Sequence, residues 1–152
     1  MKREVLYKEA LTAAIKHIGI ATYSSGKIFA YLTGKGFPED IASDVVQELI
    51  EREYINDRKA SRKVIISRTG KKQESREFIL KRLISAGVDI NIANTVVSEL
   101  ESDRVTCVNL FSALGYDSDS EENREEMIGI ASRRGYTYDI ASDAYRVWSE
   151  NI

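Results

Sequence analysis

Three segments of the chain start with a glycine and continue into an apolar pattern with helical spacing. The glycines are Gly36, Gly87 and Gly135, which are 51 and 48 residues apart in the sequence. An apolar or aromatic residue follows each of them: Phe37, Val88 and Tyr136. A recurrence of this period is typical of repeat proteins, in which each unit completes its core by stacking against its neighbours.

Apolar residues elsewhere in the chain also recur at the three- and four-residue spacing of helices. The chain has one proline in 152 residues, and its glycines mostly lie at breaks in this pattern. Ser24 or Ser25 is expected to cap the second helix and Thr137 the last one, because a hydroxyl oxygen accepts a bond from an unpaired backbone N–H at a helix start. We expect nine helices, over about residues 4–18, 25–35, 38–52, 57–69, 74–86, 89–102, 104–114, 122–134 and 137–148.

The expected helices group in threes, and each repeated glycine falls between the second and third helix of its group. Glycine is the residue that most easily ends a helix in the left-handed region, so a capping role is expected at all three positions. The sequence therefore predicts an all-α fold of three tandem three-helix repeats, at 1–55, 56–103 and 104–152. One triplet buries its helices incompletely, so we expect the repeats to stack into one continuous, elongated and curved array.

Composition bounds the class of protein. Apolar residues make up 43% of the chain and charged residues 30%, as in soluble proteins. Cys107 is the single cysteine, which excludes an internal disulfide. No stretch reaches the roughly 20 apolar residues of a membrane-spanning helix, and the first residues lack the apolar run of a signal peptide. We expect a monomeric, cytoplasmic protein with no membrane partner.

Few residues offer catalytic chemistry. His17 is the single histidine and lies near a helix end, where a capping or surface role is expected. Cys107 lies beside apolar residues and is expected to be a small buried hydrophobic residue. The acidic stretch Asp117–Glu122 lacks the glycine and the terminal glutamate of a calcium loop, and the chain contains no phosphate loop, dinucleotide fingerprint or zinc spacing. We predict a non-enzyme without catalytic residues, metal or cofactor.

Charge is strongly segregated along the chain. Residues 52–82 contain eleven Lys/Arg and four Asp/Glu, a net charge of +7, whereas residues 99–126 contain two Lys/Arg and nine Asp/Glu, a net charge of −7. Blocks of this kind create local potentials that the whole-chain charge of −2 conceals. The basic block suits a polyanion or an acidic protein surface, although lysines of this kind also occur on ordinary solvated faces. The acidic block is expected to charge the start of the eighth helix or to meet a basic partner.

The candidate contact residues are the basic residues of the middle block together with two arginines near the third glycine. They are Arg58, Lys59, Arg62, Lys63, Arg68, Lys71, Lys72, Arg133 and Arg134.

The order of these features resembles the RecX family, the bacterial modulators of the RecA recombinase. The resemblance runs from Ala10 to Trp148 and rests on four stretches in sequence: Gly36-Phe37 with its helix, Glu53–Asp57 with the basic helix after it, Lys81–Val88, and Arg133–Ile140. Glycine–aromatic pairs and small helices are common, but their order within this length is fairly specific. The chain departs from the family pattern at Ala60 and in the loop Gly70–Glu74.

The resemblance implies a non-enzymatic partner of the RecA–DNA filament that acts in recombination, DNA repair and the SOS response. Such proteins bind in the groove of the filament, touch more than one protomer and suppress its ATPase and strand-exchange activities, and several bind DNA weakly by themselves. Two other readings of the residues stay open. One is a stand-alone nucleic-acid-binding helical domain, which the sequence pI of about 5.6 disfavours. The other is a helical scaffold for an unrelated protein.

Overall fold

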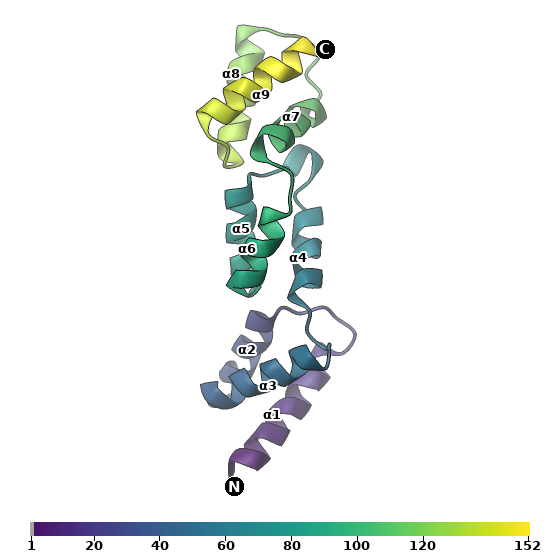
Figure 1. Cartoon of the computed structure of the whole chain (residues 1–152), viewed down its shortest axis with the longest axis vertical. Helices are drawn as coiled ribbons and strands as arrows, with labels where there is room; N and C mark the ends of the chain where they lie inside the picture. The colour runs from purple at the N-terminus through teal and green to yellow at the C-terminus, as the bar shows by residue number, and fades with distance from the viewer. Residues whose placement is uncertain (1) are drawn as a thin grey trace. The chain divides into compact units, whose positions relative to one another are not determined.

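The computed structural model describes residues 2–152 and is helical throughout that range, with no strand (Figure 1). This confirms the predicted all-α class. The elements of the described range are nine α-helices and one 3-10 turn: α1 (Lys2–Ile18), α2 (Ser25–Gly34), α3 (Glu39–Glu51), α4 (Asp57–Ile66), η1 (Gly70–Lys72), α5 (Arg76–Ser85), α6 (Ile90–Ser98), α7 (Asp103–Leu114), α8 (Glu121–Arg133) and α9 (Tyr138–Glu150).

The helices belong to two compact units. Unit 1 comprises Met1–Arg62 and Leu83–Ala93, and unit 2 comprises Lys63–Arg82 and Asn94–Ile152. The division passes through α4, α5 and α6, so each of these three helices contributes residues to both units. The three repeats with boundaries at 1–55, 56–103 and 104–152 stay a prediction.

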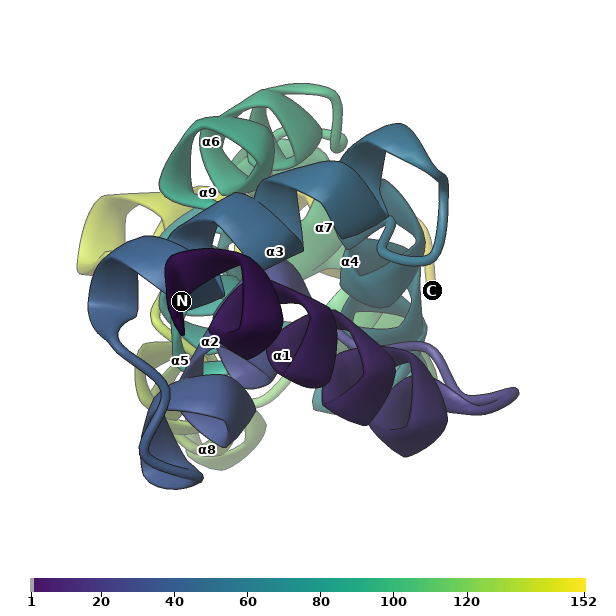
Figure 2. The ribbon, with the colours of Figure 1, turned by 90° about the horizontal axis from the view of Figure 1, so that it is seen from below.

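The core of unit 1 lies between α1, α2 and α3, which pack against one another (Figures 1 and 2). Each helix turns one apolar face inward, as its three- and four-residue spacing predicts. Fully burying an aliphatic side chain contributes about 1.5–3 kcal/mol, so this face holds the three helices together. The buried residues are Ala10, Ala14, Ile18, Ile28, Leu32, Ile41, Ala42, Val45, Val46, Leu49 and Ile55.

The core of unit 2 lies between α7, α8 and α9 and is richer in large aromatic side chains. Tyr145 packs edge-on against Phe111, with ring centroids 6.3 Å apart, and lies 5.3 Å from the ring of Trp148. Such aromatic pairs add stability beyond the area they bury. The buried residues of this cluster are Cys107, Leu110, Phe111, Met127, Ala131, Tyr136, Ala141, Ala144, Tyr145 and Trp148.

The three repeated glycines end their helices in the same way. Gly36, Gly87 and Gly135 have φ angles of +96°, +85° and +92°, in the left-handed region that favours glycine. In each case the glycine N–H bonds the carbonyl three residues back, and the next N–H bonds the carbonyl five residues back. This pair of hydrogen bonds is the Schellman motif, which satisfies two carbonyls that a helix end leaves unpaired. The predicted capping role is confirmed.

In unit 1 the cap at Gly87 packs directly on the start of α2. The N–H of Gly26 donates to the carbonyl of Gly87 at 2.8 Å, and the Ser24 hydroxyl donates to the carbonyl of Ala86 at 2.6 Å. Ser24 also accepts from the N–H of Lys27 and so caps α2, as predicted. Cβ atoms at Gly26 and Gly87 would each lie under 3 Å from backbone atoms of the other segment, so the close approach requires both glycines.

We call this contact between a glycine cap and the start of another helix a joint. A buried carboxylate completes it. Asp57, at the start of α4, accepts bonds from the N–H of Ser25 at 2.7 Å, the Ser25 hydroxyl at 2.5 Å and the N–H of Asp89 at 2.8 Å. One side chain therefore caps the N-termini of both α2 and α6. Negative charge at a helix N-terminus is favoured by the exposed N–H groups and the helix dipole.

Unit 2 contains a joint built from the same residue types. The N–H of Ser75 donates to the carbonyl of Arg134 at 3.0 Å, next to Gly135. Asp103, at the start of α7, accepts from the N–H of Arg76 at 2.9 Å and so caps α5. A Cβ at Gly135 would lie 2.4 Å from the Ser75 hydroxyl and 2.5 Å from the Phe78 ring. Serine, aspartate and glycine thus recur together at both joints.

Two helices end earlier than predicted. α4 ends at Ile66 rather than about residue 69, where the hydroxyls of Ser67 and Thr69 bond nearby helix carbonyls and replace further helical bonds. α6 ends at Ser98 rather than about residue 102. There the guanidinium of Arg76 donates to the carbonyls of Ser98, Leu100 and Glu101, which satisfies the free helix end.

Candidate functional site

The first group of candidate residues lies on α4. The N–H of Lys59 donates to the Asn56 side chain at 3.1 Å, so Asn56 caps this helix. The inward face of α4 is unusual because it buries a carboxylate and a hydroxyl, Asp57 and Ser61. The basic residues occupy the other faces and are all exposed: Arg58, Lys59, Arg62 and Lys63.

The second group lies in unit 2, where residues distant in sequence come together. Lys71 and Lys72 are exposed on η1, which replaces the plain loop expected there. The guanidinium of Arg134 donates to the carbonyl of Lys71 at 3.1 Å, across 63 positions of sequence. We call Lys71, Lys72 and Arg134 the basic turn. Several positive charges at one place raise the local potential and attract anions.

Arg133 precedes Arg134 at the C-terminal end of α8 and is exposed. Its guanidinium lies along the helix, 3.6 Å from where a Cβ at Gly129 would be. A cation at this end of a helix is stabilised by the unpaired carbonyls, so Arg133 has a structural role besides any contact with a partner.

Arg68 differs from the other candidates because it turns inward. Its Nε is buried and has no hydrogen-bond partner within residues 2–152. The side chain lines a cavity of about 300 Å³ whose apolar wall includes Ile65, Ile79 and Leu100. The sequence placed Arg68 with the surface cations because it follows them in the chain, but in the structure it is half-buried.

The nine candidates thus divide between the two units. Arg58, Lys59 and Arg62 belong to unit 1, and the remaining six belong to unit 2. Within unit 2 the hydrogen bond to Lys71 shows directly that Arg134 reaches η1.

The acidic block lies mainly on α8 and the loop before it. Glu121 and Glu122 occupy the first turn of α8, as predicted, and both are exposed. The cap itself is Ser120, whose hydroxyl accepts from the N–H of Asn123 at 3.0 Å. Asp119 accepts a bond from the Tyr145 hydroxyl at 2.6 Å and so ties the loop to α9.

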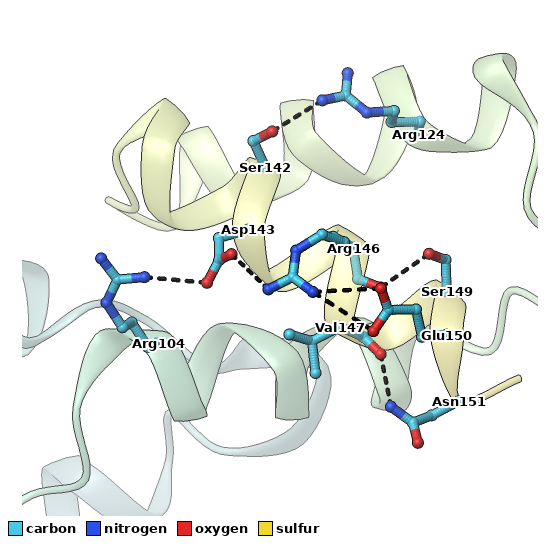
Figure 3. A network of polar contacts seen from close by, with 9 residues as sticks. All are labelled: Arg104, Arg124, Ser142, Asp143, Arg146, Val147, Ser149, Glu150 and Asn151. Atoms are coloured by element: carbon cyan, nitrogen blue, oxygen red, sulfur yellow. Dashed lines mark hydrogen bonds and ion pairs between the residues drawn. The ribbon is translucent and has the colours of Figure 1, made fainter.

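A second charged surface, which the sequence did not indicate, covers α9 (Figure 3). Asp143 binds Arg146 at 2.9 Å and Arg104 of α7 at 3.0 Å, and Arg146 also pairs with Glu150 at 3.3 Å. The hydrogen bond from Arg146, with the added charge of Arg104, holds the pKa of Asp143 below its ordinary value. These arginines already have carboxylate partners, so they offer less charge to an anion than the basic turn does.

Cys107 and His17 are the two residues that the sequence offered for catalysis. Cys107 is fully buried, as predicted, and its burial raises the pKa of its thiol to about 12, which keeps it protonated at neutral pH. His17 is exposed and stacks on tyrosines instead of facing a carboxylate. Within residues 2–152 no three metal-binding side chains gather at one point, and no helix there is long and apolar enough to cross a bilayer.

Comparison with known proteins adds two matches across most of the chain. No family model matches it. The regulatory protein RecX of Chlorobium limicola is 21% identical over 137 residues, which cover 89% of this chain and 86% of that protein. The crystal structure of RecX from Lactobacillus salivarius superposes with a TM-score of 0.75 at 21% identity and covers 98% of this chain and 99% of that one.

The chain has the RecX fold. The two matches also confirm the predicted resemblance to the RecX family. Because the structural match covers 98% of this chain, it includes both units.

Proposed function

We propose that this chain is a non-enzymatic regulator of a RecA-type recombinase, which it restrains by binding the recombinase–DNA filament in the cytoplasm. The observation that carries the proposal is the RecX fold over 98% of the chain, together with a sequence match to a RecX over 89% of it. The absence of a metal cluster in residues 2–152 and the buried state of Cys107 are compatible with a role exerted by binding.

The basic turn supplies a suitable contact for such a filament. Lys71 and Lys72 are exposed, and the Arg134 guanidinium donates a hydrogen bond to the carbonyl of Lys71. The bond from Arg134 fixes η1, so less ordering is required when the lysines meet phosphates or carboxylates. The exposed cations of α4, Lys59 and Lys63 among them, provide a further basic surface.

Co-sedimentation with preformed filaments tests the proposal. We expect the protein to pellet with a RecA-type recombinase assembled on single-stranded DNA, and to pellet less when Lys71 and Lys72 are both changed to Glu. Two controls show which component the protein binds. In one the protein is centrifuged with recombinase but no DNA, and in the other with DNA but no recombinase. Failure to pellet with filaments at any salt concentration would contradict the proposal.

Stand-alone DNA binding is the second candidate, and the exposed cations of α4 favour it. It predicts tight binding to DNA without recombinase, with an affinity that falls steeply as the salt concentration rises, because the counterions that binding releases then contribute less free energy. If the protein instead contacts the recombinase in the filament, salt should mainly change the rate of association. Binding to naked DNA as strong as binding to filaments would favour this second candidate.

A further inference from the structure

Three aromatic rings are stacked at the surface of unit 1. His17, at the end of α1, lies 3.7 Å from the ring of Tyr31 on α2, with only 10° between the ring planes. The ring of Tyr23, in the loop between these helices, lies 5.0 Å from His17 at 29°. His17 is exposed and both tyrosines are half-buried. We call these three residues the aromatic stack.

Positive charge surrounds the aromatic stack. Lys27 and Tyr31 lie four residues apart on α2, and Lys35, four residues further on, is the C-cap of this helix, so the three follow one stripe at intervals of about 6 Å. The ammonium of Lys35 lies 5.5 Å from the centre of the Tyr31 ring. Lys16 adds a further charge beside His17, and these three lysines are exposed without an ion pair in the described chain.

No acidic residue offsets this charge nearby in sequence. Residues 10–38 contain no Asp or Glu at all, although acids make up 24 of the 152 residues. Two carboxylates of the neighbouring α3 are engaged elsewhere: Asp44 pairs with Arg3 at 2.5 Å, and Glu48 accepts from Tyr7 at 2.6 Å. The segment also exposes Ile20 fully, at 108% of its reference area, in the loop beside Tyr23.

We propose that the aromatic stack is a binding surface for single-stranded nucleic acid, in which unpaired bases stack on the rings while Lys27 and Lys35 contact phosphates. Flat rings flanked by exposed cations are the combination that binders of single-stranded nucleic acid use, because every base has a face to stack and every nucleotide carries a charge. An acidic protein surface would use the lysines but would gain little from the ring faces. The proposal concerns unit 1 and holds whether or not the basic turn contacts a recombinase filament.

Binding of the full chain to two oligonucleotides of equal length tests the role of the bases. One is labelled oligothymidylate and the other is its abasic counterpart, which has the same phosphates but no bases. We expect oligothymidylate to bind about tenfold tighter or more, as stacking of one or a few bases predicts. Equal affinities measured by fluorescence anisotropy would overturn the proposal, because they would show binding by charge alone.

Substitutions test whether the aromatic stack causes the difference in affinity between the two oligonucleotides. Tyr31→Leu keeps apolar packing but removes the ring, so it is expected to abolish the difference between the two oligonucleotides. Tyr54→Leu is the matched control in unit 1, since Tyr54 is 42% exposed and has Arg52 over its ring at 5.6 Å but joins no ring stack. Equal losses in the two variants would overturn the assignment.

A third variant covers the case in which Tyr31→Leu loses its fold, as judged by its thermal unfolding. Lys27→Gln combined with Lys35→Gln changes only exposed side chains. This variant is expected to weaken binding to both oligonucleotides and to flatten the salt dependence. Unchanged affinity and salt dependence would overturn the proposal. Displacement of oligothymidylate by polyglutamate, as effective as displacement by unlabelled oligothymidylate, would do so as well, because it would indicate an acidic protein partner.

Discussion

Single residues hold the joints of this fold, and the repeated glycines are the plainest case. Gly36 and Gly87 both have positive φ, but only Gly87 faces backbone and a hydroxyl at close range, whereas Gly36 has open space around it. A comparison of the two positions therefore distinguishes two reasons for glycine: the positive φ angle, which both share, and the lack of space for a Cβ, which applies only at Gly87.

Gly36→Ala and Gly87→Ala are expected to destabilise the chain to different extents. The left-handed conformation costs about 1–2 kcal/mol for alanine at either position. At Gly87 the new Cβ would also meet Ser24 Oγ at 2.5 Å and Lys27 N at 2.9 Å, which adds about 1–3 kcal/mol. Urea unfolding followed by circular dichroism measures both, and equal losses would contradict the close approach of Gly87 to α2.

Asp57 is expected to be the most sensitive acidic residue of unit 1. Asp57→Ala removes the acceptor shared by the N–H groups of Ser25 and Asp89, which should cost about 2–4 kcal/mol because two N–H groups lose their partner. Asp40→Ala is the matched control, because Asp40 is exposed on α3. Unfolding curves that shift equally for the two variants would show that Asp57 is not a shared cap.

The sequence predicted some of these residue roles and not others. The glycine caps were predictable because a Schellman motif leaves a local signature, a glycine followed by an apolar residue at the end of a helical pattern. The contacts of Asp57 with Ser25 and Asp89 were not, because 32 residues separate Asp57 from each partner. The sequence contained a usable signal, since both joints combine a serine just before one helix (α2 or α5) with an aspartate at the start of the helix two elements later (α4 or α7).

At the scale of elements, apolar spacing predicted all nine helices, but charged side chains decided some of their ends. α6 stops at Ser98 because Arg76, 22 residues away, occupies the carbonyls after it. Arg68 was grouped with the exposed cations because it follows the basic helix, yet the chain turns after Ile66 and carries it inward. Both outcomes depend on packing between elements, which periodicity within one element does not reveal.

The pairing of α7 with α9 through Asp143 makes a pH-dependent contribution. The pKa of Asp143 is lowered in the folded chain by Arg146 and Arg104 (Figure 3). A lowered folded pKa stabilises the fold above the ordinary value of 3.8, and this stabilisation is lost as the pH falls through the folded value. Asp143→Asn should therefore be less stable than the parent chain near about pH 6 and equally stable near about pH 2.

Thermal unfolding of both proteins at the two pH values measures this effect. Added salt is the control, because it should reduce the difference near neutral pH for an exposed pair. A stability difference that is the same at both pH values would mean that Asp143 acts by packing rather than by charge.

At the scale of the whole molecule, we propose that function depends on what the two units do not share. The Ser–Asp–Gly joint occurs in both units and serves the fold. The basic turn belongs to unit 2 and the aromatic stack to unit 1, so variants in each can be assayed against a distinct partner. The recombinase partner itself is a proposal that rests on the RecX fold and on the exposure of Lys71 and Lys72.

The most direct test of whether this chain restrains a recombinase is an ATPase measurement. The steady-state rate of a RecA-type recombinase on single-stranded DNA is followed as increasing amounts of this protein are added. The account predicts that the parent chain lowers the rate. It also predicts that Lys71→Glu with Lys72→Glu requires roughly tenfold more protein for the same inhibition, because opposite charges would then repel the contact. Lys2→Glu with Lys8→Glu makes the same charge change on exposed residues of α1 and should inhibit like the parent. An ATPase rate that no amount of the parent protein lowers would contradict the account.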